Sequence, residues 1–349
     1  MIYVHVPFCR SFCVYCDFYS ERACPTEAYV AAICREAEER KNEIAASTAV
    51  NTLYFGGGTP SVLPLSYIAR IADACGGRSY DEWTVELNPD DVTPEYARGL
   101  LELGANRVSM GVQSLDDGIL RWMNRRHDSE GARHAFGLLR DAGFGNISVD
   151  IIFGVNGMSI SMLESSVRGI LEWRPEHISA YQLSVEEGSA LGRMAREGRY
   201  SEMPDEECEA QYKLICRLLA DAGYEHYEIS NWCLHGYRAV HNSAYWTRAP
   251  YVGLGPGAHS LRNNVRSWNS EELSGWKSTS EVLTDDEIRE ERIMLALRTA
   301  DGVDAALVSP RLAQPDRAVR LLEPSSVPGR LRIPESRWFT ADDIISSMI

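Results

Sequence analysis

Short apolar runs alternate with helix-length amphipathic segments along the first half of the chain. Each run has the length and composition of a buried strand, and a turn followed by a helical pattern comes after it. The predicted strands are Ile2 to Val6, Asn51 to Phe55, Trp83 to Leu87, Arg107 to Val112, Ile147 to Phe153 and His177 to Leu183. Strands that alternate with helices form parallel sheets through right-handed crossovers. The pattern predicts an α/β fold and favours a partial (β/α)6 barrel of the TIM type, although periodicity alone also fits an open sheet.

Two of the intervening helices carry clear end signals. One has Thr93 as an N-cap, Pro94 in its first turn and Gly104 where a C-cap is expected. The other starts at Asp128 and stops at Gly143.

Composition limits the possible locations and partners. The 349 residues are 44% hydrophobic, but no apolar run approaches the length that a bilayer requires. The N-terminal segment lacks the pattern of a signal peptide, so we expect a cytoplasmic protein. A net charge of -15 argues against binding to a phosphate backbone, and nucleic acid is not an expected partner.

Three of the nine cysteines, Cys9, Cys13 and Cys16, lie in one short loop after the first predicted strand. In a reducing compartment such a trio binds metal more often than it forms disulfides. A structural zinc site needs four ligands, and no second pair of cysteines follows at a suitable spacing. Three thiolates on a four-iron cluster leave one iron free for another ligand, so we predict a [4Fe–4S] cluster. The scattered cysteines are predicted to be packing residues: Cys24, Cys34, Cys75, Cys208, Cys216 and Cys233.

The ends of the next strands carry further candidates, because barrels of this type place working residues there. The stretch "GGGTP" allows close approach of backbone to a ligand, and Ser61 breaks the dinucleotide pattern GxGxxG. Glu86 interrupts an apolar run and needs an arginine or a cationic ligand. Gln113 and Asp150 suit ribose hydroxyls and Arg125 suits a carboxylate, although Asp150 as a loop cap and Arg125 as a solvated helix residue fit equally well.

The cysteine spacing resembles that of the radical S-adenosylmethionine (SAM) superfamily, in which the fourth iron is chelated by the cofactor. The resemblance implies that Gly57, Gly58 and Thr59 receive the methionine moiety, and that Glu86 binds its amino group and Arg125 its carboxylate. The remaining residues that it implies for the cofactor are Tyr3 and Tyr15 as lining residues, Gln113 and Asp150 for the ribose, and Ser184 for the adenine through its backbone.

Within that superfamily the chain resembles the oxygen-independent coproporphyrinogen III oxidases and the similar haem chaperones called HemW. The shared stretches include "YVHVPFC", "YFGGGTPS", "VELNPD", "RVSMGVQS", "SVDIIFG" and "GPGAHS". Phe18 stands where the oxidases have a further cysteine and the chaperones have phenylalanine, and the oxidases carry an N-terminal arm before the cluster loop. The resemblance therefore favours a haem chaperone, with an oxidase that decarboxylates propionates as the alternative and a binding module with a vestigial cluster as a third reading.

The chaperone resemblance also implies a haem site in "HNSAYW", with His241, Tyr245 and Trp246 as its residues and His259 as a competing iron ligand. An imidazole can ligate haem iron and aromatic rings can stack on the macrocycle. For His241 alone, a hydrogen-bonded structural histidine is an equally good interpretation. The expected partners are haem or a porphyrin, a haem-acceptor protein in solution or at a membrane surface, and an electron donor such as a flavodoxin or ferredoxin.

The resemblance suggests three parts: a barrel over 1–232, an extension over 233–285 and a small winged-helix-like module over 286–349. In the last part, "WFTADDIISSM" resembles the closing strand and helix of that module. The chain departs from the family after the fifth strand, where Asn156, Met158 and Ser159 replace the usual proline, glutamine and threonine. No contact is carried over to that loop.

Overall fold

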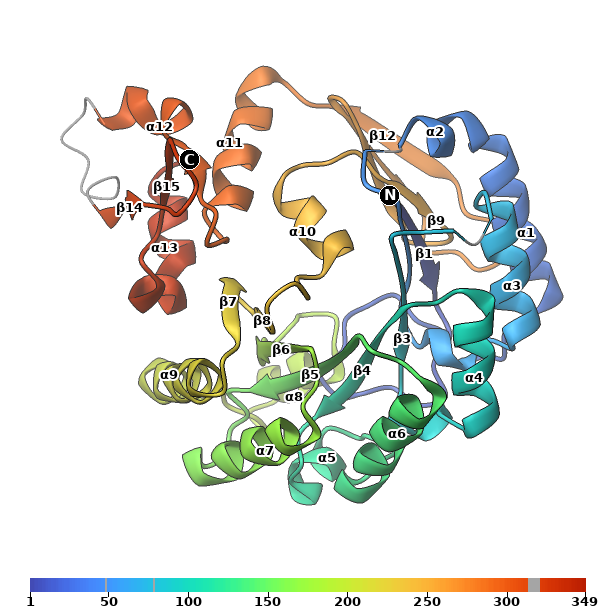
Figure 1. Cartoon of the computed structure of the whole chain (residues 1–349), viewed down its shortest axis with the longest axis horizontal. Coiled ribbons are helices and arrows are strands. Elements are labelled where there is room, and N and C mark those ends of the chain that lie inside the picture. Colours follow the sequence, from blue (N-terminus) through green and yellow to red (C-terminus); the bar gives the residue numbers. More distant parts are fainter. Residues whose placement is uncertain (48, 78, 313–320) are drawn as a thin grey trace.

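The structure is a computed structural model, and it describes all residues except 48, 78 and 313–320. All six predicted strands are present in it as parallel neighbours in chain order. Their bounds are β1 (Ile2–Val6), β2 (Thr52–Gly57), β3 (Glu82–Leu87), β4 (Arg107–Gln113), β5 (Ile147–Phe153) and β6 (His177–Gln182). The expected α/β fold with a partial barrel is confirmed, and the sheet is curved but does not close on itself (Figure 1).

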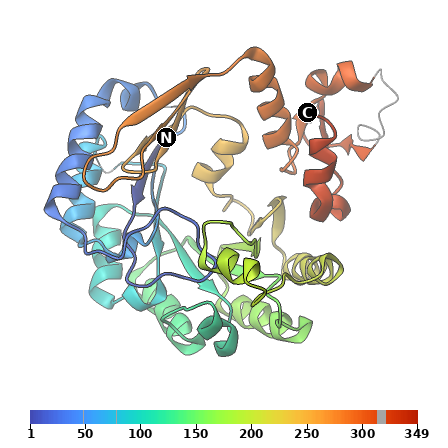
Figure 2. The same cartoon turned by 180° about the vertical axis from the view of Figure 1, so that it is seen from behind.

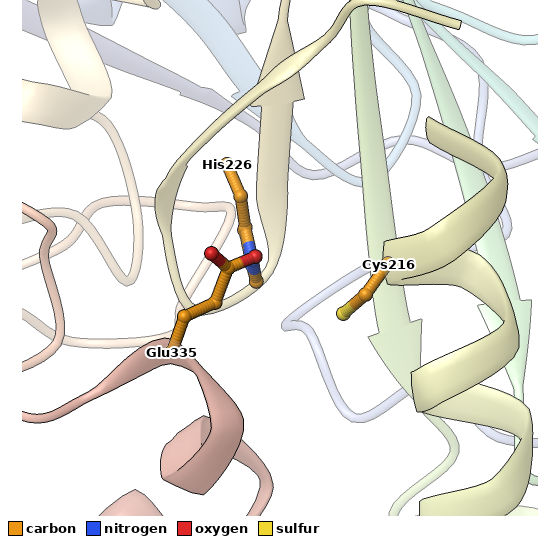
Figure 3. A group of neighbouring side chains, drawn as sticks. All are labelled: Cys216, His226 and Glu335. Atoms are coloured by element: carbon orange, nitrogen blue, oxygen red, sulfur yellow. The ribbon is translucent and has the colours of Figure 1, made fainter. Parts of the chain in front are cut away.

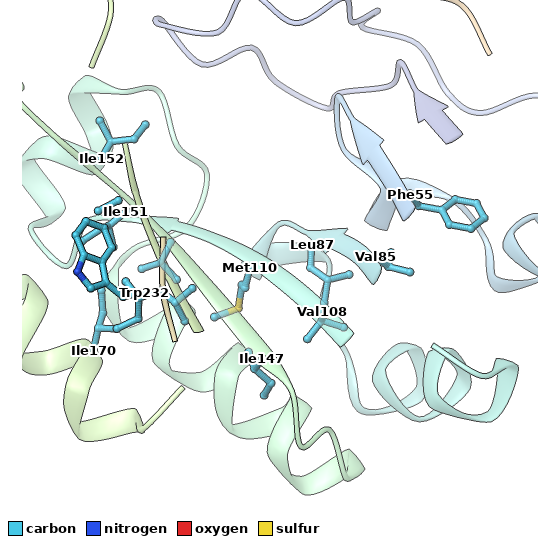
Figure 4. Close-up of a cluster of buried hydrophobic side chains, with 14 of the residues drawn as sticks. Phe55, Val85, Leu87, Val108, Met110, Ile147, Ile151, Ile152, Ile170 and Trp232 are labelled. Atoms are coloured by element: carbon cyan, nitrogen blue, oxygen red, sulfur yellow. The ribbon is translucent and has the colours of Figure 1, made fainter. Parts of the chain in front are cut away.

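Helices cover the outer face of this curved sheet (Figures 1 and 2). They are α1 (Glu27–Glu39), α2 (Lys41–Ala46), α3 (Leu65–Ala74), α4 (Pro94–Leu103), α5 (Asp117–Trp122), α6 (Ser129–Ala142), α7 (Ile160–Trp173) and α9 (Asp205–Asp221), with short 3-10 turns η1 (Pro60–Val62) and η2 (Pro89–Asp91). The short helix α8 (Ala190–Arg196) lies instead at the carboxyl end of the strands, where Leu191 donates to the carbonyl of Val14 (Figure 2). Figure 4 shows the apolar side chains, Phe55 and Trp232 among them, that form the core with these strands.

The predicted helix ends are confirmed. The Thr93 side chain accepts a hydrogen bond from the backbone N–H of Tyr96, and Asp128 accepts one from Gly131. Gly104 and Gly143 both adopt the left-handed conformation, with φ of 107° and 108°. A residue with a Cβ is strained there, so glycine stops each helix at a defined point.

Three additional strands extend the sheet at both edges. β9 (Val252–Leu254) lies parallel to β1, while β8 (Asn231–Cys233) is antiparallel to β6 and β7 (Glu225–Glu228) to β8. Between them, α10 (Val240–Trp246) enters the concave side of the sheet (Figure 1). An antiparallel sheet of β10 (His259–Arg262), β11 (Val265–Asn269) and β12 (Ser278–Val282) follows.

The C-terminal module combines helices with a small antiparallel sheet. It contains α11 (Asp285–Ala296), β13 (Val303–Asp304), α12 (Ala305–Leu312), β14 (Glu323–Pro324), β15 (Arg330–Arg332), η4 (Glu335–Thr340) and α13 (Ala341–Ser346). For "WFTADDIISSM" the expected helix is confirmed as α13, but the strand expected before it, at "WFT", is wrong, because these residues belong to the 3-10 helix η4. Pro334 fixes the start of that turn, and the buried Trp338 donates its indole N–H to the carbonyl of Ile333. The three-part domain division remains a prediction.

Among the described helices, none combines the length and the apolar character needed to cross a membrane.

Candidate metal and cofactor site

The cysteine loop leaves the carboxyl end of β1 and is held by contacts from two other parts of the chain. The Val14 N–H donates to the carbonyl of Met123 at 3.2 Å, and the Leu191 N–H donates to the carbonyl of Val14 at 2.7 Å. The side-chain amide of Asn124 donates to the carbonyl of Phe12 at 2.7 Å. Backbone bonds of this kind fix the path of the loop without using any thiol, so the three sulfur atoms stay available as ligands.

All three thiols are unpaired, and they lie close enough to influence one another. Burial raises the pKa of Cys9 and raises that of Cys16 to about 11, and the Cys13 and Cys9 thiols add to the effect at Cys16. Arg125 Nη1 donates to Cys13 Sγ at 3.4 Å, and the Thr59 hydroxyl lies 3.3 Å from Cys9 Sγ. The arginine provides positive charge where a metal would convert the thiols to thiolates.

The glycine segment after β2 lies against this loop. The Gly58 N–H donates to the carbonyl of Val6 at 2.8 Å. A Cβ at Gly58 would come within 3.0 Å of the Phe8 carbonyl oxygen and 3.1 Å of Cys9 Sγ. Gly57 has a φ of 108°, and a Cβ there would lie 2.6 Å from the ring of His5. Only glycine lets the backbone approach the cysteine loop this closely. We call Gly57 and Gly58 the glycine cradle, and this segment fits a bulky cluster ligand.

Three polar side chains are partly exposed on strands that are otherwise mostly buried: Glu86 on β3, Gln113 on β4 and Asp150 on β5. The neighbouring residues of β3 and β5 are buried, whereas these side chains are partly open, so they face the interior of the curved sheet. At the end of β4 a bulge gives Gln113 a φ of 68° and turns its side chain away from the regular alternation. These polar side chains therefore lie inside the curved sheet, at the carboxyl ends of adjacent strands, where parallel barrels bind ligands.

Glu86 and Asp150 are both held by neutral hydroxyl groups. The Tyr54 hydroxyl donates to Glu86 Oε1 at 2.8 Å, and Ser109 donates to both carboxylate oxygens of Asp150 at 3.1 and 3.0 Å. Burial raises the pKa of Glu86 to about 7, and the charge of Asp150 adds to this rise. Burial also raises the pKa of Asp150. Two carboxyl groups of this kind favour a cationic ligand such as an ammonium or sulfonium group.

Arg125 is oriented by groups that the sequence did not single out. Its Nη2 donates to the carbonyl of Gly111 at 2.6 Å and to Asn88 Oδ1 at 2.5 Å. Its Nε is buried and has no hydrogen-bond partner among the described residues. This unpaired donor beside the cysteine loop fits the predicted carboxylate partner.

The aromatic candidates have different roles. Tyr3 lies beside Tyr54, with ring centres 6.1 Å apart, and its hydroxyl is 3.1 Å from His5 Nδ1. Burial raises the pKa of Tyr15, and the charge of Arg125 opposes that rise, so this ring lies by the cysteine loop. Phe18 is 71% exposed. Ser184 is exposed just after β6, and its hydroxyl donates to Glu186 Oε1 at 2.7 Å.

His241 lies at the other edge of the sheet from the cysteine loop. Its Nδ1 is 2.8 Å from Thr52 Oγ1, and its backbone N–H donates to the Glu82 carboxylate at 2.8 Å. Thr52 and Glu82 are the first residues of β2 and β3, whereas the cysteine loop follows the last residue of β1. His241 Nε2 is 3.1 Å from the Tyr245 hydroxyl, and burial lowers the pKa of His241 to about 3. In this conformation both ring nitrogens of His241 already have partners.

His259 lies on the same side as the cysteine loop. It follows β9, which runs parallel to β1, so the end of β9 and the start of the loop share one edge. The exposed His259 ring stacks with Trp268, with centres 6.3 Å apart and planes 24° apart. Burial lowers the pKa of His5, and His259 lies near enough to add to this effect. Trp246, by contrast, has a buried indole N–H without a partner among the described residues.

The fold and this arrangement of three cysteines, a glycine cradle and interior polar groups define a radical SAM protein. Residues 3–169 match the family model described as the radical SAM superfamily. Over most of its length the chain is also similar to curated haem chaperones, and it belongs to the HemW family of that superfamily.

The relatives that support this assignment are bacterial. The chain is 33% identical over 321 residues to the haem chaperone HemW of Bacillus subtilis (strain 168), which covers 86% of this chain and 84% of that protein. It is 32% identical over 340 residues to the HemW of Mycobacterium tuberculosis (strain ATCC 25618 / H37Rv), covering 92% and 86%. A solved structure, the radical SAM coproporphyrinogen III oxidase HemN of Escherichia coli, superposes with a TM-score of 0.78 at 18% identity over 99% of this chain and 89% of that one. That likeness shows the fold.

Gly58→Ala tests the cradle. The new methyl group would press on the Phe8 carbonyl and on Cys9 Sγ, so we expect the iron content after anaerobic reconstitution to fall severalfold while the fold is kept. Gly137→Ala in α6 is the control, because a Cβ there meets nothing within 4 Å, and it should leave iron content unchanged. Full iron loading of Gly58→Ala would show that the close approach is not required.

Glu86→Gln tests the electrostatics of the interior. Because the folded pKa of Glu86 is about 7 against an ordinary 4.5, the folded state loses stability as the pH rises from about 4.5 through 7. In the cluster-free protein the substitution should therefore raise the free energy of unfolding by about 2 kcal/mol at pH 8 and by much less at pH 5.

Denaturant titrations at both pH values measure this difference. Glu95→Gln, an exposed change on α4, is the control and should alter stability by less than about 0.5 kcal/mol at either pH. An equal effect of Glu86→Gln at pH 5 and pH 8 would contradict the raised pKa.

Proposed function

We propose that this chain is a haem chaperone of the cytoplasm that holds a [4Fe–4S] cluster, SAM and haem, and delivers haem to an acceptor protein. The observation that carries the proposal is the similarity to curated haem chaperones over most of both chains. Phe18 supports it, because the resembled oxidases have a further cysteine at that position.

For the cluster and cofactor, the proposed ligands are Cys9, Cys13 and Cys16, with Glu86 and Arg125 at the two ends of the methionine moiety. A bound cluster supplies the electron that cleaves the C5′–S bond of SAM. The chain itself would hold the ammonium group of SAM beside the Glu86 carboxylate. It would hold the carboxylate of SAM beside Arg125 Nε, which has no hydrogen-bond partner among the described residues. Gln113 and Asp150 are proposed to receive the ribose hydroxyls, and a flavodoxin or ferredoxin to deliver the electron.

The rim of the cysteine side offers apolar surface for a porphyrin. Phe12 and Phe18 in the cysteine loop are 46% and 71% exposed. Exposed aromatic side chains next to a functional site are typical of a surface that receives a flat apolar ligand or a partner protein. His259 and Trp268 lie on the same side, and the exposed His259 imidazole can reach an iron bound at this surface.

The position of His241 makes it a less direct iron ligand. Haem binding through either ring nitrogen would break a hydrogen bond, to Thr52 of β2 or to Tyr245 of α10. We therefore propose His259 as the ligand that meets haem on the cysteine side. A haem site at the opposite edge of the sheet, formed by His241, Tyr245 and Trp246, remains a prediction.

The test offers haem and coproporphyrinogen III in parallel to the anaerobically reconstituted and reduced protein with SAM. We expect stoichiometric haem binding in absorbance spectra and no decarboxylated porphyrinogen by chromatography. Turnover that depends on Cys9, Cys13 and Cys16 would make the protein an oxidase instead. Haem transfer unaffected by loss of the cluster would favour a binding module with a vestigial cluster.

Two histidine variants locate the haem ligand. His259→Ala should weaken haem binding about tenfold or more, whereas His241→Gln, which can still form hydrogen bonds in the interior, should bind nearly as tightly as the parent. The exposed His134→Ala in α6 is the control. Loss of haem in His241→Gln together with normal binding in His259→Ala would place the haem at the opposite edge.

A further inference from the structure

A second group of metal-ligating side chains lies far along the chain from the cysteine loop. Cys216 of α9, His226 of β7 and Glu335 of η4 point toward one another (Figure 3). One ligand atom from each residue lies within 4.8 Å of those from the other two. His226 Nδ1 and Glu335 Oε1 are 2.8 Å apart. The group joins the barrel to the C-terminal module, and neither the cluster nor the proposed SAM site uses it.

The imidazole in this group is held rigidly by its neighbours. Its ring stacks on Trp232 at 4.0 Å with planes 13° apart, and it meets the Trp338 ring edge-on at 4.3 Å. Only 5% of the side chain is exposed. His226 Nε2 lies 3.4 Å from the Tyr212 hydroxyl and 3.5 Å from the carbonyl oxygen of Ile229. Metal-bound histidines usually donate their second N–H to such a carbonyl, so the surroundings orient Nδ1 toward Glu335.

The three donor types match one class of metal. A thiolate, an imidazole and a carboxylate are ligands of Zn²⁺, which binds them at about 2.0–2.3 Å in a tetrahedral arrangement. Ligand atoms in such a site lie about 3.3–3.6 Å apart, so the present atoms need shifts of only about 1 Å. The Glu335 side chain is 52% exposed, which allows it to adjust and lets water reach the fourth position.

We propose that Cys216, His226 and Glu335 bind a zinc-class divalent cation, with water as the fourth ligand, and that this ion fastens the C-terminal module to the barrel. The ion takes the place of the proton between His226 and Glu335, and the Cys216 thiol releases its proton to solvent. Binding therefore weakens as the pH falls. The module already contacts the same region through Trp338 and through the pairing of Phe339 with Tyr212, so the ion strengthens an existing contact.

The experiment measures zinc in the full chain after its iron–sulfur cluster has been reconstituted, so that the three loop cysteines are occupied. Protein exposed to Zn²⁺ and then dialysed against a weak chelator should retain one zinc per chain by elemental analysis. Zinc should also slow proteolysis or hydrogen exchange in residues 321–349. Glu335→Gln, an exposed change that leaves the core intact, should lose the zinc and the protection while iron content stays normal.

Two cysteine variants provide the matched comparison. Cys216→Ser should lose the zinc, and Cys34→Ser, a half-buried thiol on α1 that donates to the carbonyl of Arg70, should keep it. Retention of zinc by both Glu335→Gln and Cys216→Ser, or no retained zinc in the parent, would overturn the proposal. Because iron and haem are measured separately, either result is distinct from failure of the proposed chaperone function.

Discussion

One partly buried cation, the guanidinium of Arg125, ties together the parts of the site that come from distant positions in the chain. It contacts Cys13 Sγ from the first loop, the carbonyl of Gly111 from β4, and Asn88 from the turn after β3. A charge in such surroundings is tolerated only when it is paired or hydrogen-bonded, so the fold must bring these three groups to it. The same charge offsets the negative charge that three thiolates would bring. The position of Arg125 therefore depends on the correct arrangement of the strands and places its charge beside the proposed cluster ligands.

The sheet separates two edges with different roles. At the carboxyl edge the backbone comes close to the loop, through Gly57 and Gly58, and polar side chains remain partly open. At the amino edge α10 closes the interior: Glu82 accepts both backbone N–H groups of Val240 and His241. These bonds satisfy donors at the start of a short helix, where no helical partners exist. His241 thus has a clear structural role as a brace between α10 and β2, and this role is independent of any ligand.

The sequence predicted what local pattern and short-range chemistry determine. Strand positions follow from apolar runs, and the helix ends follow from Thr93, Gly104, Asp128 and Gly143, because capping is decided within a few residues. The loop with three cysteines was equally clear, since Cys9, Cys13 and Cys16 all lie within eight residues of one another. For the site, the residues at strand ends could be named because parallel strands bring their carboxyl ends together.

What the sequence could not show depends on contacts between distant segments. The addition of β9 to β1 joins residues about 250 positions apart, and the burial of His241 depends on Thr52 and Glu82 at the starts of other strands. Asn88 and Asn124 support the site through single hydrogen bonds that no local pattern marks. The strand expected at "WFT" failed for a similar reason: the apolar pair Trp338–Phe339 packs against Tyr212 and His226 of the barrel from a 3-10 turn.

The buried charged groups of the interior favour a cationic ligand. Arg107 is almost fully buried beside Glu82, and the charges of Glu82 and Asp150 raise its pKa. Its charge also opposes the rise in the pKa of Glu86 and of Asp150, but burial outweighs it at both groups, whose side-chain hydrogen bonds come from hydroxyl groups. Two neighbouring carboxyl groups with raised pKa values bind a cation and lose the cost of their mutual repulsion when they do. SAM carries positive charge at its sulfonium and its ammonium group, so a bound SAM would bring charge of the sign that Glu86 and Asp150 attract.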